Sequence, residues 1–209
     1  MDNHNTIINT IYALAATVDA KDHFTYGHSK KVSKYAADIA EALGFPEDRV
    51  AEVRAAALLH DIGKIGVSDQ ILTKGGSLTD EEWEPIHTHP SMGVSIIKHV
   101  QGLNGCLAGI GYHHERFDGS GYPSGLKGHN IPIDARIIAV ADAFDAMTSP
   151  RPYRKKMTLQ DAARELERCS GTQFDPLIVK VFVKLLEPSI SANSRSTRAK
   201  LSAVRDVPV

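Results

Sequence analysis

The sequence predicts an all-α protein, a multi-helix bundle with one main domain. Apolar residues recur at intervals of three and four along most of the chain, which is the period of a helix with one buried face. No segment shows the sustained alternation of apolar and polar residues that a half-buried strand requires. With 209 residues, 42% of them hydrophobic, the chain is long enough for one domain with a continuous core.

Three helices are expected in the N-terminal third. The first follows the apolar spacing of residues 7–18, and the second follows that of residues 32–43 until Gly44 stops it. Pro46 opens the third, whose segment "VAEVRAAALLH" is rich in Ala and Leu and therefore favours close helix packing. The glycines of "HDIGKIG" should end this helix.

The middle of the chain alternates loops and helices. Thr79 and Glu82 form the pattern of a capping box, which predicts the start of a short helix. A further helix is expected over residues 91–100, after Pro90. The segment "GYHHERFDGSGYPSGL" holds four glycines and Pro123, so we expect residues 111–126 to form an irregular loop.

The C-terminal part predicts three more helices and a tail. They are expected in "IDARIIAVADAFDAMTS" after Pro132, in "TLQDAARELER" after a Thr cap, and in "FDPLIVKVFVKLL" after Pro176. Residues 188–209 are polar and rich in Ser and Arg, which predicts a mobile tail outside a main domain of residues 1–187.

Composition excludes several classes of partner. The formal charge of −1 arises from 24 basic and 25 acidic residues without segregation, so neither a nucleic acid polymer nor a membrane surface is an expected partner. The N-terminus has no basic segment before an apolar run, so neither a signal peptide nor a membrane span is expected. Cys106 and Cys169 stand apart, as in a reducing compartment. A cytoplasmic location is the expectation.

Histidines and carboxylates gather in a pattern that predicts a metal centre. His60 and Asp61 are adjacent at the end of an apolar helix, where a buried carboxylate needs a cation or several donors beside it. Asp142, within its own predicted helix, also needs a cation or several donors beside its carboxylate. Asp145 is the alternative candidate for this position. The remaining candidates are His28, His89, His113 and His114. Five isolated histidines are set aside as ligands: His4, His23, His87, His99 and His129.

This ligand set indicates hydrolysis of a phosphoester at two metal ions. Imidazole and carboxylate ligands without thiolates suit Fe, Mn, Co or Zn. Asp61, with two oxygens, is the natural bridge between two ions that activate a water. Lys64 lies one turn beyond His60 and can reach a phosphate oxygen or remain solvated. The basic turn "SPRPYRKK", with Arg151 and Arg154, can bind a nucleotide or be a surface turn.

The order of these motifs identifies a family. "HDIGKIG", "HHERFDGSGYP" and "VADAFDAMTSPRPYR", together with His28 and His89, resemble the HD-GYP subgroup of the HD-domain phosphohydrolase superfamily. The resemblance extends from Ile11 to Leu186. It implies an HD-domain-like bundle with two or three metal ions, often iron or manganese, at its centre. It also implies hydrolysis of cyclic di-GMP to linear pGpG, and in some members to GMP, which lowers the level of this second messenger.

The resemblance assigns roles to matching positions. The metal ligands it implies are His28, His60, Asp61, His89, His113, His114 and Asp142. Asp61 and Lys64 are the expected catalytic residues, with a metal-bridging hydroxide as the nucleophile. The expected contacts to the substrate are Lys64, Tyr122, Arg151 and Arg154. The glycines and Pro123 should bring the loop close to the site, with Glu115 and Asp118 fixing the loop or orienting ligands.

Two positions depart from the family pattern. Members with a third metal carry a Glu four residues before the first ligand histidine, and Phe24 stands there. We therefore expect two divalent ions, Fe or Mn, and a product that stops at pGpG. The second departure is Gly75, where the family commonly has proline; it makes this loop more mobile.

Two other functions fit the same residues. A phosphodiesterase for 3′,3′-cyclic GMP-AMP would use the same metal chemistry, which fixes the reaction and not the bases. A catalytically inactive module that binds a cyclic dinucleotide or a signalling partner protein is the second alternative, and the intact ligand set argues against it. The sequence does not define the oligomeric state.

Overall fold

The computed structural model describes residues 2–21, 27–150 and 156–205, with side chains for residues 10–18, 21, 27–150 and 156–192. Regular structure in these ranges is helical, apart from a β-bridge between Ser170 and Phe174, so the all-α prediction is confirmed. The main helices are α1 (Asp2–Lys21), α2 (His28–Ala42), α3 (Glu47–Leu59), α4 (Asp69–Leu72), α5 (Asp80–Ile97), α6 (Leu107–Tyr112), α7 (Ile133–Thr148), α8 (Leu159–Arg168) and α9 (Pro176–Arg205). Short 3₁₀ helices are η1 (Ile62–Gly66), η2 (Asn104–Cys106) and η3 (Gly128–Asn130).

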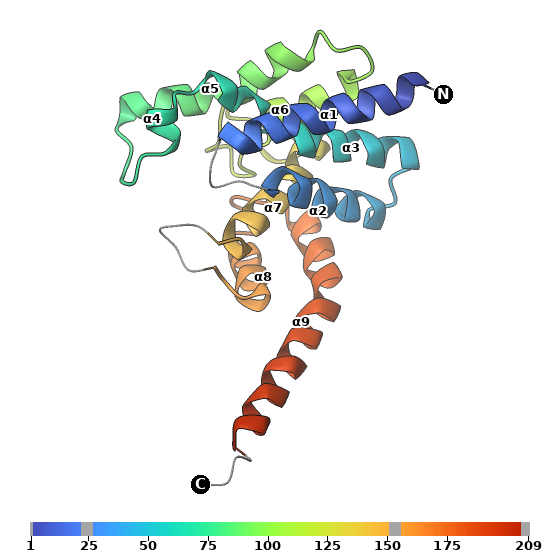
Figure 1. Cartoon of the computed structure of the whole chain (residues 1–209), viewed down its shortest axis with the longest axis vertical. Helices are drawn as coiled ribbons and strands as arrows, with labels where there is room; N and C mark the ends of the chain where they lie inside the picture. The colour runs from blue at the N-terminus through green and yellow to red at the C-terminus, as the bar shows by residue number, and fades with distance from the viewer. Residues whose placement is uncertain (1, 22–26, 151–155, 206–209) are drawn as a thin grey trace.

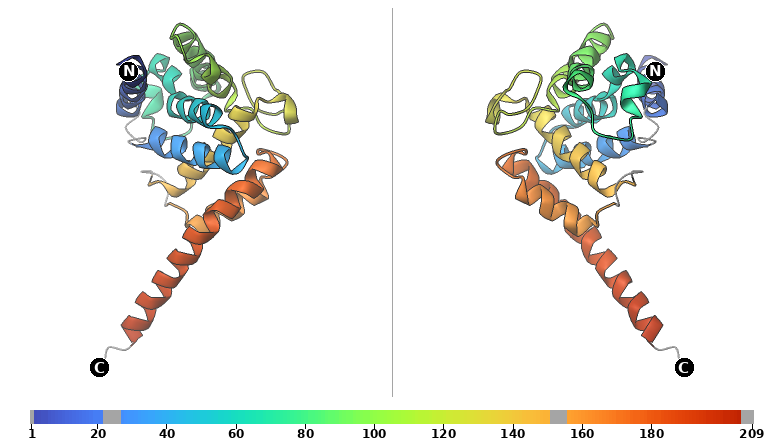
Figure 2. Two further views of the ribbon diagram at one scale, coloured as in Figure 1. Left: turned by 90° about the vertical axis from the view of Figure 1, so that its right-hand side faces the viewer. Right: turned by 90° about the vertical axis from the view of Figure 1, so that its left-hand side faces the viewer.

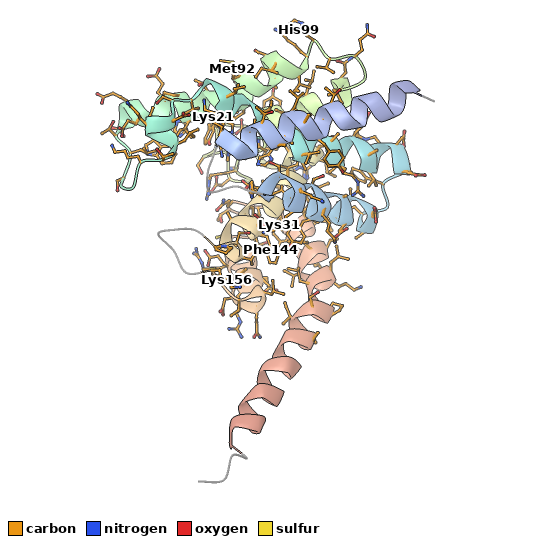
Figure 3. The ribbon with its side chains drawn as sticks, viewed as in Figure 1. Lys21, Lys31, Met92, His99, Phe144 and Lys156 are labelled. Atoms are coloured by element: carbon orange, nitrogen blue, oxygen red, sulfur yellow. The ribbon has the colours of Figure 1, made fainter. Side chains whose placement is uncertain are left out.

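Helices α2, α3 and α7 form the centre of the bundle. Helix α2 packs on α3 and α7, α1 covers α3, and α5 packs against η1 (Figure 1). Tyr35, Phe144 and Phe182 meet edge to face, with ring centroids 5.0 to 5.7 Å apart. This aromatic cluster joins α2, α7 and α9, and Figure 3 labels Phe144 at that junction. The core therefore fixes the helices from which the metal-capable side chains project.

Helix α9 leaves the body of the molecule. Its first turns pack against α8, α7 and α2, and its C-terminal half projects away from the other helices (Figure 2). The helix passes Pro188 and reaches Arg205, in the segment for which composition predicts a mobile tail. Pro188 lies on an exposed stretch, so water can satisfy the carbonyl that its missing N–H leaves free. The domain boundary at residue 187 and the mobility of the tail stay predictions.

Helix α5 corrects the expectation of a separate helix over residues 91–100. It begins with the predicted capping box of Thr79 and Glu82 and continues through Pro85 and Pro90 to Ile97. Proline removes one backbone hydrogen bond and does not by itself end a helix, provided that the freed carbonyl finds another donor.

Helix α6 is a second departure, because the glycines around it conceal its helical pattern. A Cβ atom on Gly109 would lie 2.9 Å from both the Ala56 Cβ and the Ile138 Cδ1. Glycine is thus needed there for α6 to pack between α3 and α7. In the part of the chain that the structure describes, no helix combines the length and apolarity needed to cross a membrane.

Candidate metal centre

Most of the centre is built where helices end, while His89 and Asp142 lie inside α5 and α7. His28 is the first residue of α2, His60 follows α3 directly, and His113 follows α6. Asp61 comes between α3 and η1, and it is buried together with these histidines. The local breaks that the sequence predicted, "HDIGKIG" above all, therefore turn these side chains inward to one point.

Three of the histidines are oriented by the same device. The Nδ1 atoms of His60, His89 and His113 each donate to the carbonyl oxygen three residues earlier, at 2.7, 2.5 and 2.7 Å. A carbonyl oxygen accepts and never donates, so Nδ1 carries the proton in each ring. In the neutral ring, Nε2 then holds a lone pair directed into the site, as a metal ligand requires.

The carbonyl oxygen that accepts from His89 is available for a different reason than those that accept from His60 and His113. His60 and His113 lie at the ends of helices, where the last carbonyls have no intrahelical donor. His89 lies inside α5, where the carbonyl of Ile86 would normally accept from the N–H of residue 90. That residue is Pro90, which has no N–H, so Ile86 is free to accept from His89.

The Nε2 atoms of His60, His89 and His113 lie close to one another and to Asp61. His89 Nε2 and His113 Nε2 lie 3.3 Å apart, and both are acceptors when the rings are neutral. Among the described residues, His60 Nε2 is buried without a hydrogen-bond partner, and it lies 3.3 Å from the Oδ2 atom of Asp61. Acceptors that face one another in a buried site need a cation between them. The residues present therefore fit a metal ion.

The ligand-capable atoms fall into two groups. One group contains Asp61, His89, His113 and His114, and the other contains His28, His60 and Asp142. Within each group the atoms lie within 4.8 Å of one another. Asp61 connects the groups, because its Oδ1 lies 3.3 Å from His89 Nε2 and its Oδ2 lies 3.3 Å from His60 Nε2. The structure thus brings together all seven of the predicted metal ligands.

Asp142 and Asp145, the two alternative candidates on α7, lie beside different nitrogens of the His28 ring. Asp145 Oδ2 accepts from His28 Nδ1 at 2.7 Å, while Asp142 Oδ1 lies 3.2 Å from His28 Nε2. Asp145 is buried and also accepts from the Ser149 hydroxyl at 2.9 Å. Asp142 therefore faces the centre, and Asp145 orients the imidazole from behind.

Charge and burial set the protonation of the site. Burial raises the pKa of Asp61, but the Lys64 ammonium and His60 outweigh it, so this pKa lies well below its ordinary value. Burial lowers the pKa of His113 strongly and that of His114 to about 4. An ionised carboxylate and neutral imidazoles are the forms that bind metal.

His28 behaves differently in the metal-free state. Burial lowers its pKa, but its hydrogen bonds to Asp142 and Asp145 outweigh this effect and raise the pKa to about 10. At neutral pH the His28 ring is therefore protonated, with Nδ1 facing Asp145 and Nε2 facing Asp142.

Two glycines let the ligand-bearing segments approach. A Cβ atom on Gly63 in η1 would lie 1.9 Å from the carbonyl oxygen of His89 and 2.6 Å from the backbone nitrogen of Gly93. A Cβ atom on Gly93 would in turn lie 2.9 Å from an Ile110 methyl group. Bare backbone at both positions brings η1 and α5 into direct contact, and with them Asp61 and His89.

Hydrogen bonds and a ring contact hold the loop after α6 against the site. Glu115 is buried and accepts from the backbone N–H groups of Ser124 and Leu126 at 2.7 and 3.0 Å.

The same loop approaches its own backbone closely. A Cβ atom on Gly121 would lie 2.3 Å from the backbone nitrogen of Arg116. The next residue, Tyr122, stacks on His114, with ring centroids 4.8 Å apart. The Asp118 carboxylate accepts from the backbone and hydroxyl of Ser120. The expected loop-fixing roles of Glu115 and Asp118 agree with these contacts.

The expected substrate contacts are placed in part. Lys64 donates to Asp61 Oδ2 at 2.7 Å and lines a cleft of about 1300 Å³, as does Tyr122. Asp61, His89, His114 and other site residues form part of the same wall. Arg151, Arg154 and Phe24 lie outside the described residues.

Sequence reasoning missed three features of the site. The first is Pro90, which was recognisable in the sequence. A proline directly after a candidate histidine ligand on a helix leaves one carbonyl without its backbone donor, and the histidine can then donate to that carbonyl. The role of Asp145 needed the three-dimensional contact with His28. His87, set aside as a ligand, packs against Tyr122 with ring centroids 4.3 Å apart and lines the cleft beside Trp83.

Fold and site together define an all-helical domain with a buried histidine and carboxylate centre of the kind that serves metal-assisted hydrolysis. The profile of the HD domain family matches residues 13–178. The chain belongs to this family. The loop triplet Gly121, Tyr122 and Pro123 is the motif of its HD-GYP subgroup.

Curated relatives carry phosphodiesterase names. The chain is 45% identical over 170 residues to a "Cyclic di-GMP phosphodiesterase" of Thermotoga maritima, covering 79% of this chain and 45% of that protein. It is 40% identical over 178 residues to the cyclic di-GMP phosphodiesterase response regulator RpfG of Xanthomonas campestris, covering 84% and 47%. It is 40% identical over 166 residues to "3'3'-cGAMP-specific phosphodiesterase 3" of Vibrio cholerae, covering 79% and 36%. The chain spans less than half the length of these relatives.

Solved structures share the fold. A cyclic GMP-AMP specific phosphodiesterase of Vibrio cholerae superposes with a TM-score of 0.69 at 20% identity, covering 96% of this chain and 53% of that one. An HDG"Y"P protein from Bdellovibrio bacteriovorus superposes with a TM-score of 0.63 at 21% identity, covering 77% and 51%.

Proposed function

We propose that this domain is a metal-dependent phosphodiesterase that hydrolyses cyclic di-GMP to linear pGpG. The observation that carries the proposal is the pair of ligand groups that meet at Asp61, on the wall of a cleft of about 1300 Å³. A cleft of this size accommodates a cyclic dinucleotide. The names of the relatives from Thermotoga maritima and Xanthomonas campestris support the choice of substrate.

Each group of side chains would hold one divalent ion. His28, His60 and Asp142 would hold one ion and His89, His113 and His114 the other, with Asp61 shared between them. Imidazoles and carboxylates without thiolates suit Fe, Mn, Co or Zn, and iron or manganese is the proposed metal because the resemblance to the HD-GYP subgroup implies it. Two divalent ions bound there supply an activated water and offset negative charge on the phosphate oxygens.

The protein's own groups would orient the phosphodiester. The Lys64 ammonium keeps Asp61 ionised and, from the wall of the cleft, can donate to a non-bridging phosphate oxygen. Tyr122, fixed on His114, bounds the substrate on the loop side. Arg151 and Arg154 are proposed as further contacts to the nucleotide on the basis of the motif alone. With Phe24 in place of a third carboxylate ligand, we propose two ions and a reaction that stops at pGpG.

The second candidate substrate is 3′,3′-cyclic GMP-AMP. The relative from Vibrio cholerae whose name specifies this dinucleotide is as similar in sequence as one named for cyclic di-GMP. The metal chemistry is the same for both, so the bases alone distinguish them.

The test combines metal analysis with product analysis. Protein purified without oxygen and loaded with Fe²⁺ or Mn²⁺ should bind two ions per chain, and it should convert cyclic di-GMP to pGpG faster than it converts cyclic GMP-AMP. Asp61→Ala should lose both ions and the activity. Asp69→Ala is the matched control, because its carboxylate is exposed on α4 and lies outside the ligand groups. Full metal occupancy without turnover of either dinucleotide would contradict the proposed function.

A further inference from the structure

Three aromatic side chains continue outward from the metal centre along the cleft. Tyr122 stacks on His114 at 4.8 Å, His87 packs on Tyr122 at 4.3 Å, and Trp83 stacks on His87 at 5.5 Å, all measured between ring centroids. The interplanar angle is 26° for both stacked pairs. We call Tyr122, His87 and Trp83 the aromatic ladder. It connects a metal-capable histidine to a part of the cleft that the proposed metal chemistry does not use.

Trp83 is the outermost member of the ladder and is poorly covered. It lies one turn before His87 on α5, its residue surface is 42% exposed, and it lines the same cleft as Lys64 and Asp61. Ile71 and Leu72 line the cleft as well. An indole that forms the wall of a concave surface, with apolar neighbours, provides a flat face for a planar ligand.

We propose that Trp83 is the stacking surface for a purine base of the cyclic dinucleotide, an inference that rests on the proposed function. When the scissile phosphate is at the metal centre, the bases must lie farther along the cleft, where the ladder ends. Every base has a π-face, so stacking supplies affinity without selecting the base. Trp83 should therefore strengthen binding of cyclic di-GMP and of cyclic GMP-AMP by similar factors.

The chain offers a direct optical test, because Trp83 is its one tryptophan. Addition of GMP to the folded protein should quench tryptophan fluorescence in a saturable manner, since a stacked base contacts the only indole. The control compound is the sugar phosphate ribose 5-phosphate, which has the phosphate without the base and should leave the emission unchanged. Emission that GMP does not alter beyond the effect of ribose 5-phosphate would overturn the proposal.

Kinetics of the metal-loaded enzyme provide the second test. Trp83→Ala should raise KM for cyclic di-GMP about tenfold with kcat unchanged, whereas Trp83→Phe should retain most of the affinity. Met92→Ala is the matched control, because Met92, labelled in Figure 3, is an apolar residue of α5 with a similar exposure and is not among the residues that line the cleft. An unchanged KM in Trp83→Ala would refute the role of Trp83. A wild-type protein without turnover would refute the proposed function, and the fluorescence titration would still decide the stacking.

Discussion

Replacement of Gly63 by alanine should separate the two segments that carry Asp61 and His89. The new Cβ atom would lie 1.9 Å from the His89 carbonyl oxygen, whereas ordinary contacts begin at 3.4 Å. Helix α5 must therefore retreat from η1 by about 1.5 Å, the difference between these two distances. The obstacle is backbone on both sides, so a change of rotamer cannot relieve it.

The expected loss in the free energy of unfolding follows from the overlap between the new Cβ atom and the His89 carbonyl. Overpacking in a well-packed core costs about 1–3 kcal/mol, and a backbone clash belongs at or above the upper end of that range. The same movement would widen the 3.3 Å separation of Asp61 Oδ1 and His89 Nε2, which should weaken the metal site by at least tenfold. Gly66→Ala is the matched control in the same 3₁₀ helix, because its Cβ atom would contact the Met92 side chain at 3.5 Å.

The assay is urea unfolding of metal-free protein, followed by titration with Zn²⁺. Gly63→Ala should lower the free energy of unfolding by about 3 kcal/mol or more, and Gly66→Ala should change it by less than about 1 kcal/mol. If both variants unfold at the urea concentration of the wild type and bind equal amounts of metal, the close contact between η1 and α5 is not what positions His89.

Three further predictions concern the orientation and the protonation of the histidines. Pro90→Ala restores an N–H that competes with His89 for the carbonyl of Ile86, so Zn²⁺ affinity should fall about 10- to 100-fold while the metal-free protein remains folded; unchanged affinity would contradict the argument. Asp145→Asn should lower metal affinity by a similar factor, measured in the same titration, because the amide no longer holds the His28 imidazole as a charged acceptor does. In metal-free protein the pKa of His28 is raised from 6.5 to about 10, so its contribution to stability is complete below pH 6.5 and is lost as pH rises through 10. Urea unfolding across this range, compared with His28→Gln, checks the sign; a wild type that gains stability relative to the variant on raising the pH would refute it.

The sequence predicted the helices whose ends carry strong local signals. Gly44, Pro46 and the capping box of Thr79 mark boundaries that the structure has at the same places. Helix α6 was missed because Gly109 lowers helix propensity, while the structure needs that glycine for contact with α3 and α7. Tertiary packing outweighs local propensity at such a position, and no single-sequence pattern reports it.

The candidate ligands were predictable as a set, but their geometry was not. Adjacent pairs such as His60 and Asp61 are unusual at the end of an apolar helix, and the order of motifs identified the family. The distinct roles of Asp142 and Asp145 depend on which nitrogen of His28 each one faces. That choice is made by the packing of α2 against α7, two segments far apart in the sequence.

Breaks in the helices explain why an all-helical fold can hold this centre. Inside an intact helix each carbonyl already accepts from a backbone N–H, so a histidine ring that bonds to it must share that acceptor. His60 and His113 use the free carbonyls of helix ends, and Pro90 creates an equivalent carbonyl for His89 within α5. Each interruption costs backbone hydrogen bonding and gains a fixed imidazole. The irregular points of the chain are thus the source of a precise arrangement of ligands, and substitutions that restore regular helix at these points should weaken metal binding without unfolding the protein.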